Sequence, residues 1–176
     1  MAEKTIDIAS PILSRNERLA DQLRQRFNEA GTYVINVLSS PGSGKTTTIL
    51  GTNERLRDKA GLRCAVIEGD IASDVDAITM KEAGMPAIQI NTGGLCHLEG
   101  NMIMEAVDAF DQAVGLQNID VIFIENVGNL VCPVDFDLGE NLSIMILSVP
   151  EGDDKPIKLS LIHISGAHET RHDLVC

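Results

Sequence analysis

The sequence predicts an α/β fold with a parallel sheet that helices cover on both faces. Five short runs are apolar at nearly every position, which is typical of strands buried on both faces. Helical stretches separate these runs, so successive strands are joined by crossovers and lie parallel. Ligands of such sheets bind beyond the carboxyl ends of the strands, where this chain keeps its glycines and several acids. We predict the strands at residues 33–38, 64–67, 87–90, 121–124 and 142–149.

Residues 1–31 are predicted to form one amphipathic helical segment, packed on the main body or on a partner. Ser14 and Glu17 have the spacing of a capping box, and Gly31 supplies a stop. Between them, apolar residues recur at every fourth position: Leu19, Leu23 and Phe27. Further helices are predicted from the loop after the first strand to about residue 61, through residues 76–83, and then to about residue 114.

The composition excludes several classes of partner. The chain has 176 residues, with 14 lysines and arginines against 26 aspartates and glutamates, a net charge of −12. Such a chain is not drawn to nucleic acid or to an anionic membrane surface. No apolar run reaches the roughly 20 residues that span a bilayer, and no secretion signal precedes the first strand. We therefore expect a cytoplasmic protein whose four cysteines are reduced thiols.

The segment Ser-Ser-Pro-Gly-Ser-Gly-Lys-Thr, residues 39–46, indicates a phosphate-binding loop between a strand and a helix. It matches GxxxxGK[ST] except that Ser39 stands at the first glycine. Gly42 and Gly44 let the backbone turn its N–H groups toward phosphates, and the helix N-terminus favours negative charge. Lys45 would reach the β- and γ-phosphates, and the Thr46 hydroxyl would hold Mg²⁺. The alternative is a glycine-rich turn with an incidental lysine.

Two acids at strand ends fit the same site. Asp70 follows the second apolar run, and Glu125 follows the fourth, in the position of a Walker-B acid. Either would bind Mg²⁺ or orient the attacking water. The alternative is that each is a solvated acid at a strand terminus.

A second group of residues has the chemistry of a transition-metal site. Cys96 and His97 follow a glycine pair after the third strand, and Cys132 lies in the loop after the fourth. Thiolate and imidazole suit Zn²⁺ and Ni²⁺, but three ligands are one short of a closed tetrahedral site. A water, another residue or a second subunit would complete it. The alternative is that both cysteines are small hydrophobes and His97 is a polar residue at a helix start. Cys64, inside an apolar strand, is predicted to be core.

Several blocks resemble the hydrogenase nickel-incorporation GTPase family, HypB. They are SSPGSGKTT, VIEGDIASDVDA, INTGGLCHLEG, IENVGNLVCPVDFDLGE and LSVPEGDDKP, in collinear order from residue 33 to residue 156. The resemblance implies a P-loop NTPase fold of the SIMIBI type and a GTPase that helps to load nickel into [NiFe] hydrogenase. It also implies a nucleotide- and metal-dependent homodimer and contacts with hydrogenase maturation proteins and the hydrogenase large subunit.

The resemblance also assigns site residues. Lys45, Asp70 and Glu125 would serve hydrolysis, with Thr46, Asp70 and Glu125 around Mg²⁺. Cys96, His97 and Cys132 would bind nickel or zinc at the dimer interface. The residues expected to bind GTP are Pro41, Gly42, Ser43, Gly44, Lys45, Thr46 and Thr47.

The chain departs from the family pattern in two ways. It contains no Asn-Lys-x-Asp motif for guanine, which leaves another P-loop ATPase or a small-molecule kinase open as the alternative. The urease nickel-insertion GTPases are a further alternative, although they lack the NVGNLVCP block. The pattern stops after Lys158. We therefore predict a GTPase domain at residues 32–158 that is incomplete at its C-terminal end, followed by a non-native tail at 159–176.

Overall fold

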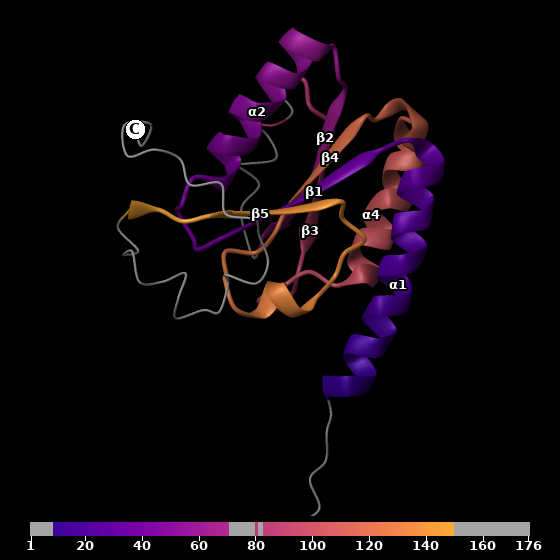
Figure 1. Cartoon of the computed structure of the whole chain (residues 1–176), viewed down its shortest axis with the longest axis vertical. Helices are drawn as coiled ribbons and strands as arrows, with labels where there is room; N and C mark the ends of the chain where they lie inside the picture. The colour runs from indigo at the N-terminus through magenta and orange to yellow at the C-terminus, as the bar shows by residue number, and fades with distance from the viewer. Residues whose placement is uncertain (1–8, 71–79, 81–82, 150–176) are drawn as a thin grey trace, which may run out of the picture.

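The computed structural model describes residues 9–70, 80 and 83–149 (Figure 1). Its sheet has five parallel strands in the order β3-β2-β4-β1-β5. The strands are β1 (Tyr33–Ser39), β2 (Cys64–Asp70), β3 (Ala87–Asn91), β4 (Val121–Glu125) and β5 (Leu142–Ile146). The helices are α1 (Ala9–Ala30), α2 (Lys45–Ala60) and α4 (Gly100–Ala113), with short 3₁₀ turns η1 (Leu116–Asn118) and η2 (Cys132–Asp135). The predicted parallel α/β sheet is confirmed.

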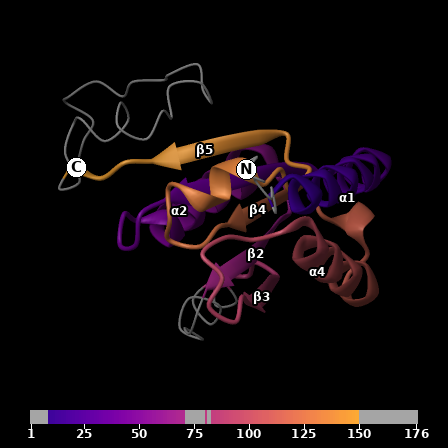
Figure 2. The ribbon, with the colours of Figure 1, turned by 90° about the horizontal axis from the view of Figure 1, so that it is seen from below.

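Two apolar cores lie on opposite faces of the sheet, because successive side chains of a strand point to opposite sides. On β4, Ile122 and Ile124 join the core under α1 and α4, which lie beside each other (Figure 2). Val121 and Phe123 of the same strand join the other core, to which α2 contributes Ile49. The molecule therefore has three layers, and its central strand is buried along its whole length.

Helix α1 packs on the main body, with Leu23 and Phe27 buried in the α4-side core. It begins at Ala9, so Ser14 and Glu17 lie inside the helix, and the capping-box prediction of its start is wrong. Pro11 stands in the first turn, where its missing N–H costs no hydrogen bond. The predicted stop is confirmed, because Gly31 follows the last helical residue with a φ of +72°.

Two glycines let α1 approach the chain closely. A Cβ on Gly100, at the start of α4, would lie 2.9 Å from Leu19 Cβ. A Cβ on Gly139 would lie 2.8 Å from the carbonyl oxygen of Ala20. The helix thus touches both the start of α4 and the loop before β5, and Arg24 adds an ion pair of 2.7 Å to Asp137 in that loop.

Some boundaries differ from the sequence-based ones. Strand β2 runs on to Asp70, three residues past the predicted end, and β5 ends at Ile146 instead of residue 149. The predicted helix at 76–83 lies largely outside the described residues, although Met80 is helical and buried. The predicted tail at 159–176 lies outside them too.

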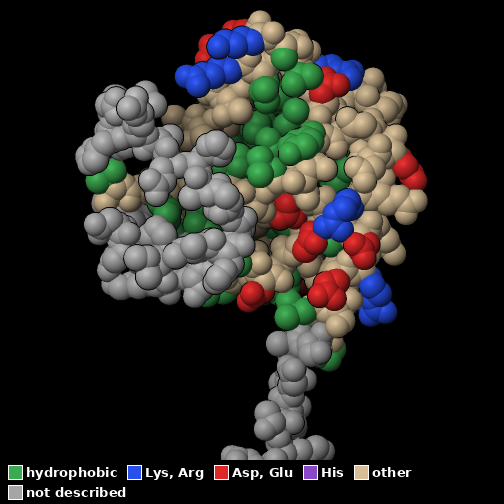
Figure 3. Space-filling view, in the orientation of Figure 1, with side chains coloured by type: hydrophobic (Ala, Val, Ile, Leu, Met, Phe, Trp, Pro, Cys, Tyr) green, Lys and Arg blue, Asp and Glu red, His purple; other side chains and the backbone are tan. Residues whose placement is uncertain are grey.

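Strand β5 is an edge of the described sheet and keeps apolar side chains in solvent. Leu142 is 43% exposed and Ile144 is 38% exposed. On the face drawn in Figure 3, hydrophobic side chains also gather beside α2. Within the part of the chain that is described, no helix is both long enough and apolar enough to cross a membrane.

Candidate nucleotide and metal sites

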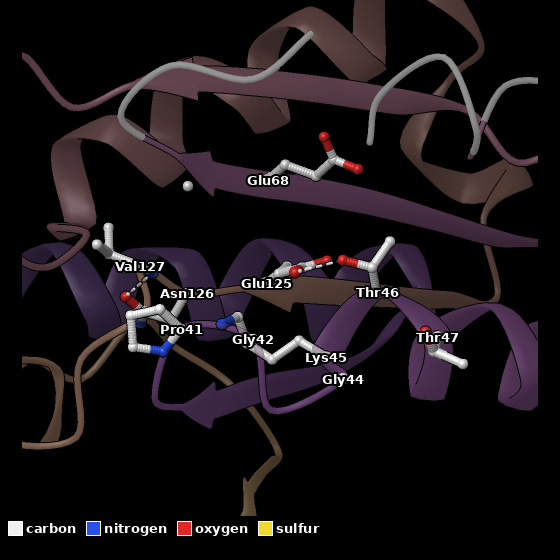
Figure 4. A pocket seen from close by; sticks show the side chains of 12 residues that line it. Pro41, Gly42, Gly44, Lys45, Thr46, Thr47, Glu68, Glu125, Asn126 and Val127 are labelled. Atoms are coloured by element: carbon white, nitrogen blue, oxygen red, sulfur yellow. Dashed lines mark hydrogen bonds between the residues drawn. The ribbon is translucent and has the colours of Figure 1, made fainter. Parts of the chain in front are cut away.

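The phosphate-binding loop joins β1 to α2 at the carboxyl edge of the sheet. Gly42 and Gly44 have φ values of +72° and +88°, which side chains with a Cβ rarely adopt. The loop forms one wall of a cavity of about 490 Å³ (Figure 4). Residues from the ends of β2 and β4 form the other walls. The lining residues are Pro41, Gly42, Gly44, Lys45, Thr46, Thr47, Glu68, Gly69, Glu125, Asn126, Val127 and Gly128.

The serine at the first position of the motif has a structural explanation. Ser39 is fully buried at the end of β1, and its Oγ accepts a hydrogen bond of 3.0 Å from Lys45 Nζ. The hydroxyl therefore holds the lysine at the loop. Six of the seven residues predicted to bind the nucleotide line the cavity, and the exception is Ser43, whose hydroxyl donates to Ser40 O within the loop.

Glu125 lies where the Walker-B comparison placed it. It ends β4, is only 8% exposed, and Oε1 accepts a hydrogen bond of 2.9 Å from Thr46 Oγ1, as Figure 4 shows. A hydroxyl beside a carboxylate is the oxygen donor set that Mg²⁺ takes in P-loop proteins, so these two residues fit that ion. Asp70 is the last residue of β2, but its side chain is not among those described.

Sequence reasoning missed Glu68. It pairs in register with Glu125 on the neighbouring strand, lines the cavity, and is 3% exposed. Its signal was present, because residues two apart on a strand share a face and Glu68 precedes Asp70 by two. The apolar-run criterion ended the strand at Ile67 and so overlooked an acid that faces the cavity from inside β2.

The loops after β3 and β4 bring part of the predicted metal set together. Cys96 Sγ lies 3.7 Å from His97 Nδ1, and the neighbouring Cys132 thiol raises the pKa of Cys96 through a hydrogen bond. The His97 ring stacks on Phe136 with centroids 3.9 Å apart. Its Nε2 lies 3.4 Å from Glu99 Oε1.

This cluster is not a complete metal-coordination site as it stands. Among the described histidine, cysteine, aspartate and glutamate side chains, no three are arranged to hold one ion. The apolar neighbours Leu95 and Val131 are 41% and 60% exposed, so the cluster lies at an accessible surface. Cys64 is buried in the α2-side core, as predicted, and burial raises the pKa of its thiol to about 11.

Three features define the class of protein: the parallel sheet, the loop that carries Lys45, and the carboxylate of Glu125 at the end of the neighbouring strand β4. They are those of a P-loop nucleoside-triphosphate-binding protein. Sequence comparison agrees, because the profile of the CobW/HypB/UreG nucleotide-binding domain matches residues 33–147. The chain belongs to the CobW/HypB/UreG family, and its predicted resemblance to HypB is confirmed.

Two curated relatives illustrate the similarity. The hydrogenase/urease maturation factor HypB of Helicobacter hepaticus is 46% identical over 156 residues, which are 89% of this chain and 63% of that protein. The hydrogenase maturation factor HypB of Escherichia coli K12 is 46% identical over 155 residues, which are 88% of this chain and 51% of that protein. The chain thus spans about half to two thirds of the length of these relatives.

Solved structures give the same result. HypB from Helicobacter pylori in complex with nickel superposes with a TM-score of 0.75 at 44% identity, covering 82% of this chain and 65% of that one. HypB from Archaeoglobus fulgidus superposes with a TM-score of 0.73 at 40% identity, covering 83% of this chain and 68% of that one. The signal recognition particle receptor FtsY from Elizabethkingia anophelis superposes with a TM-score of 0.54 at 19% identity, over 94% of this chain and 64% of that one. This likeness shows a shared fold alone. The predicted three-layer SIMIBI-type fold is confirmed.

Proposed function

We propose that the protein is a GTP-hydrolysing nickel metallochaperone that assists nickel insertion into [NiFe] hydrogenase. One observation carries the proposal. A phosphate cavity and a Cys96–His97–Cys132 cluster lie on loops at the same carboxyl edge of one sheet, in a chain that belongs to the HypB-containing family. The nickel complex of the H. pylori relative supports the choice of metal.

The nucleotide chemistry follows from the cavity. Backbone N–H groups of the loop and Lys45 would bind the phosphates of GTP. Thr46, Glu125 and Asp70 would hold Mg²⁺, and the ion would neutralise charge on the β- and γ-phosphates. A water would attack the γ-phosphorus and the bond to the β–γ bridging oxygen would break, which leaves GDP and inorganic phosphate. Asp70 or Glu125 would orient this water.

Nickel would be the cargo. Cys96, His97 and Cys132 would bind it, or zinc, with a fourth ligand from a second copy of the chain in a homodimer. Loss of the γ-phosphate would relax the neighbouring loops and thereby change the affinity for the metal. Maturation proteins and the hydrogenase large subunit would receive the ion.

The names of two relatives, from Helicobacter hepaticus and Helicobacter pylori, favour a second candidate. Both are hydrogenase/urease maturation factors, 46% and 44% identical to this chain. Nickel delivered to urease would require the same two sites. Complementation of a hydrogenase-deficient strain and of a urease-deficient strain, each measured by its own enzyme activity, distinguishes the two destinations.

Two measurements test the proposal. Titration of the protein with GTP and ATP analogues should give a clear preference for GTP, and a preference for ATP would refute the GTPase assignment. Titration with Ni²⁺, read together with the dimerisation constant, should show weaker binding for Cys96→Ala and for Cys132→Ala than for the wild type. Cys64→Ala is the matched control, because that thiol is buried in the core. Equal nickel affinity in all four proteins would refute the metal site.

A further inference from the structure

One buried amide links the nucleotide cavity to the segment that carries Cys96 and His97. Asn126 directly follows Glu125, lines the nucleotide cavity, and is 1% exposed. Its Oδ1 accepts hydrogen bonds from the backbone N–H groups of Val127, at 2.9 Å, and Leu98, at 3.4 Å. The second bond crosses to the segment that carries Cys96 and His97. Asn126 therefore connects the end of β4 to the first metal-binding loop.

Leu98 anchors that loop to the cavity wall. Its side chain is fully buried, and its Cγ and both methyl carbons lie 2.8 Å from the position that a Cβ on Gly69 would take. Gly69 lines the nucleotide cavity at the end of β2. The residue that follows His97 is thus in close contact with one wall of the cavity and hydrogen-bonded to the other.

The other side of the amide leads to the second loop. Asn126 Nδ2 donates to Asn36 Oδ1 at 3.3 Å, and Asn36 Nδ2 donates to Glu140 Oε1 at 3.1 Å. Glu140 Oε2 accepts the backbone N–H of Leu138 at 2.8 Å. Leu138 and Glu140 belong to the connection between β4 and β5, which also carries Cys132. Asn126 reaches this loop through one intervening amide, Asn36, which is itself 1% exposed.

We propose that Asn126 is the positioning residue through which the nucleotide and the Cys96–His97–Cys132 cluster influence one another. The inference rests on the proposed function. The bonds to Leu98 and Asn36 are the long ones of the network, so a small shift of the Glu125–Asn126 segment breaks them. A buried amide must find new partners when its bonds break, and this moves both loops together.

The test compares nickel affinity in two nucleotide states. The dissociation constant for Ni²⁺ is measured on the full chain with saturating GDP and with a non-hydrolysable GTP analogue. In the wild type we expect the two constants to differ by about 5-fold or more, the usual scale of coupling between sites. In Asn126→Ala we expect the ratio to fall to within about twofold of one, while the protein still binds both nucleotides and nickel.

Asn16→Ala is the matched control. Asn16 lies on α1, is 5% exposed, and also hydrogen-bonds to the segment after His97 and to the connection before β5. Its Oδ1 accepts the N–H of Gly100 at 2.7 Å, and its Nδ2 donates to Asp137 O at 2.7 Å. It does not line the cavity. Its removal therefore loosens both loops without cutting their link to the nucleotide, and the ratio should stay near that of the wild type.

The outcomes are distinct. A lost ratio in Asn126→Ala with a retained ratio in Asn16→Ala supports the inference. A retained ratio in Asn126→Ala, or equal loss in both variants, overturns it and leaves the proposed function standing. A wild type that binds nickel equally in both states overturns the nucleotide–metal coupling itself, and Asn126 with it. If Asn126→Ala does not fold, Asn126→Ser, which leaves a small polar group at the site but is too short to replace the amide, takes its place under the same criteria.

Discussion

Replacing Gly128 by alanine is expected to weaken nucleotide binding, because Gly128 lies against the phosphate loop. A Cβ there would lie 2.9 Å from Pro41 Cγ, 3.0 Å from Pro41 N and 3.1 Å from Pro41 Cα. Ordinary van der Waals contact begins at 3.4 Å. Two of the three atoms are backbone, and the proline ring fixes φ, so the loop itself must move. Overpacking of this kind costs about 1–3 kcal/mol.

That cost falls on the loop that binds phosphate, so most of it should appear in the affinity for nucleotide. At about 1.4 kcal/mol per tenfold change, the dissociation constant for GDP should rise about 5- to 150-fold. Equilibrium titration with a fluorescent guanine nucleotide measures this dissociation constant. Urea unfolding of the free protein measures the part of the cost that appears as lost stability. The reasoning is refuted if Gly128→Ala binds within twofold of the wild type and unfolds at the same urea concentration.

Gly51→Ala is the control for this experiment. Gly51 lies in α2, which begins at the phosphate loop, and a Cβ there would meet no atom within 4 Å. Alanine is the better helix former, so this variant should gain about 0.5–1 kcal/mol of stability. Its affinity for nucleotide should not change. A glycine-to-alanine change near the loop is thus harmful only where the added methyl meets Pro41.

Three further predictions concern the rest of the molecule. Phe110→Ala empties a site that is 2% exposed in the α4-side core, and urea unfolding should show a loss of about 3–5 kcal/mol. Arg63 lowers the pKa of Asp120 to about 2 through hydrogen bonds, so this pair stabilises the fold above about pH 4 and the effect is lost as pH falls toward 2. The pair is partly exposed, so solvent screening should keep the loss small, and Asp120→Asn should remove it from the pH dependence of unfolding. Cys64 is buried whereas Cys96 is partly exposed, so iodoacetamide at pH 8 should modify Cys96 before Cys64, as read by mass spectrometry of digests.

The sheet was predictable because each of its strands is a short run of mainly apolar residues. Each apolar run became a strand, and the alternation with helices implied the parallel arrangement that the structure shows. The phosphate loop was predictable for a related reason. Its glycines and its lysine are required by the local geometry of the loop, so a short sequence motif is enough to identify it.

What escaped prediction depends on distant contacts. The sequence could place Glu68 on the same face of β2 as Asp70, but its pairing with Glu125 requires knowing that β2 and β4 are neighbours although β3 lies between them in the sequence. The hydrogen bonds of Asn16 to Gly100 and Asp137, far along the chain, were not predictable from the sequence either. The Cys96, His97 and Cys132 roles stay predictions. Ring stacking of His97 on Phe136 is a tertiary contact that ligand spacing does not encode.

The close seating of α1 determines where the protein can be divided. The family profile covers residues 33–147, which suggests a natural cut just ahead of β1. A polypeptide trimmed there would leave a cavity where Leu23 and Phe27 pack beneath α4, and Gly100 and Asp137 would lose their hydrogen-bond partner Asn16. Anyone preparing a minimal nucleotide-binding unit should therefore retain the leading helix as part of it.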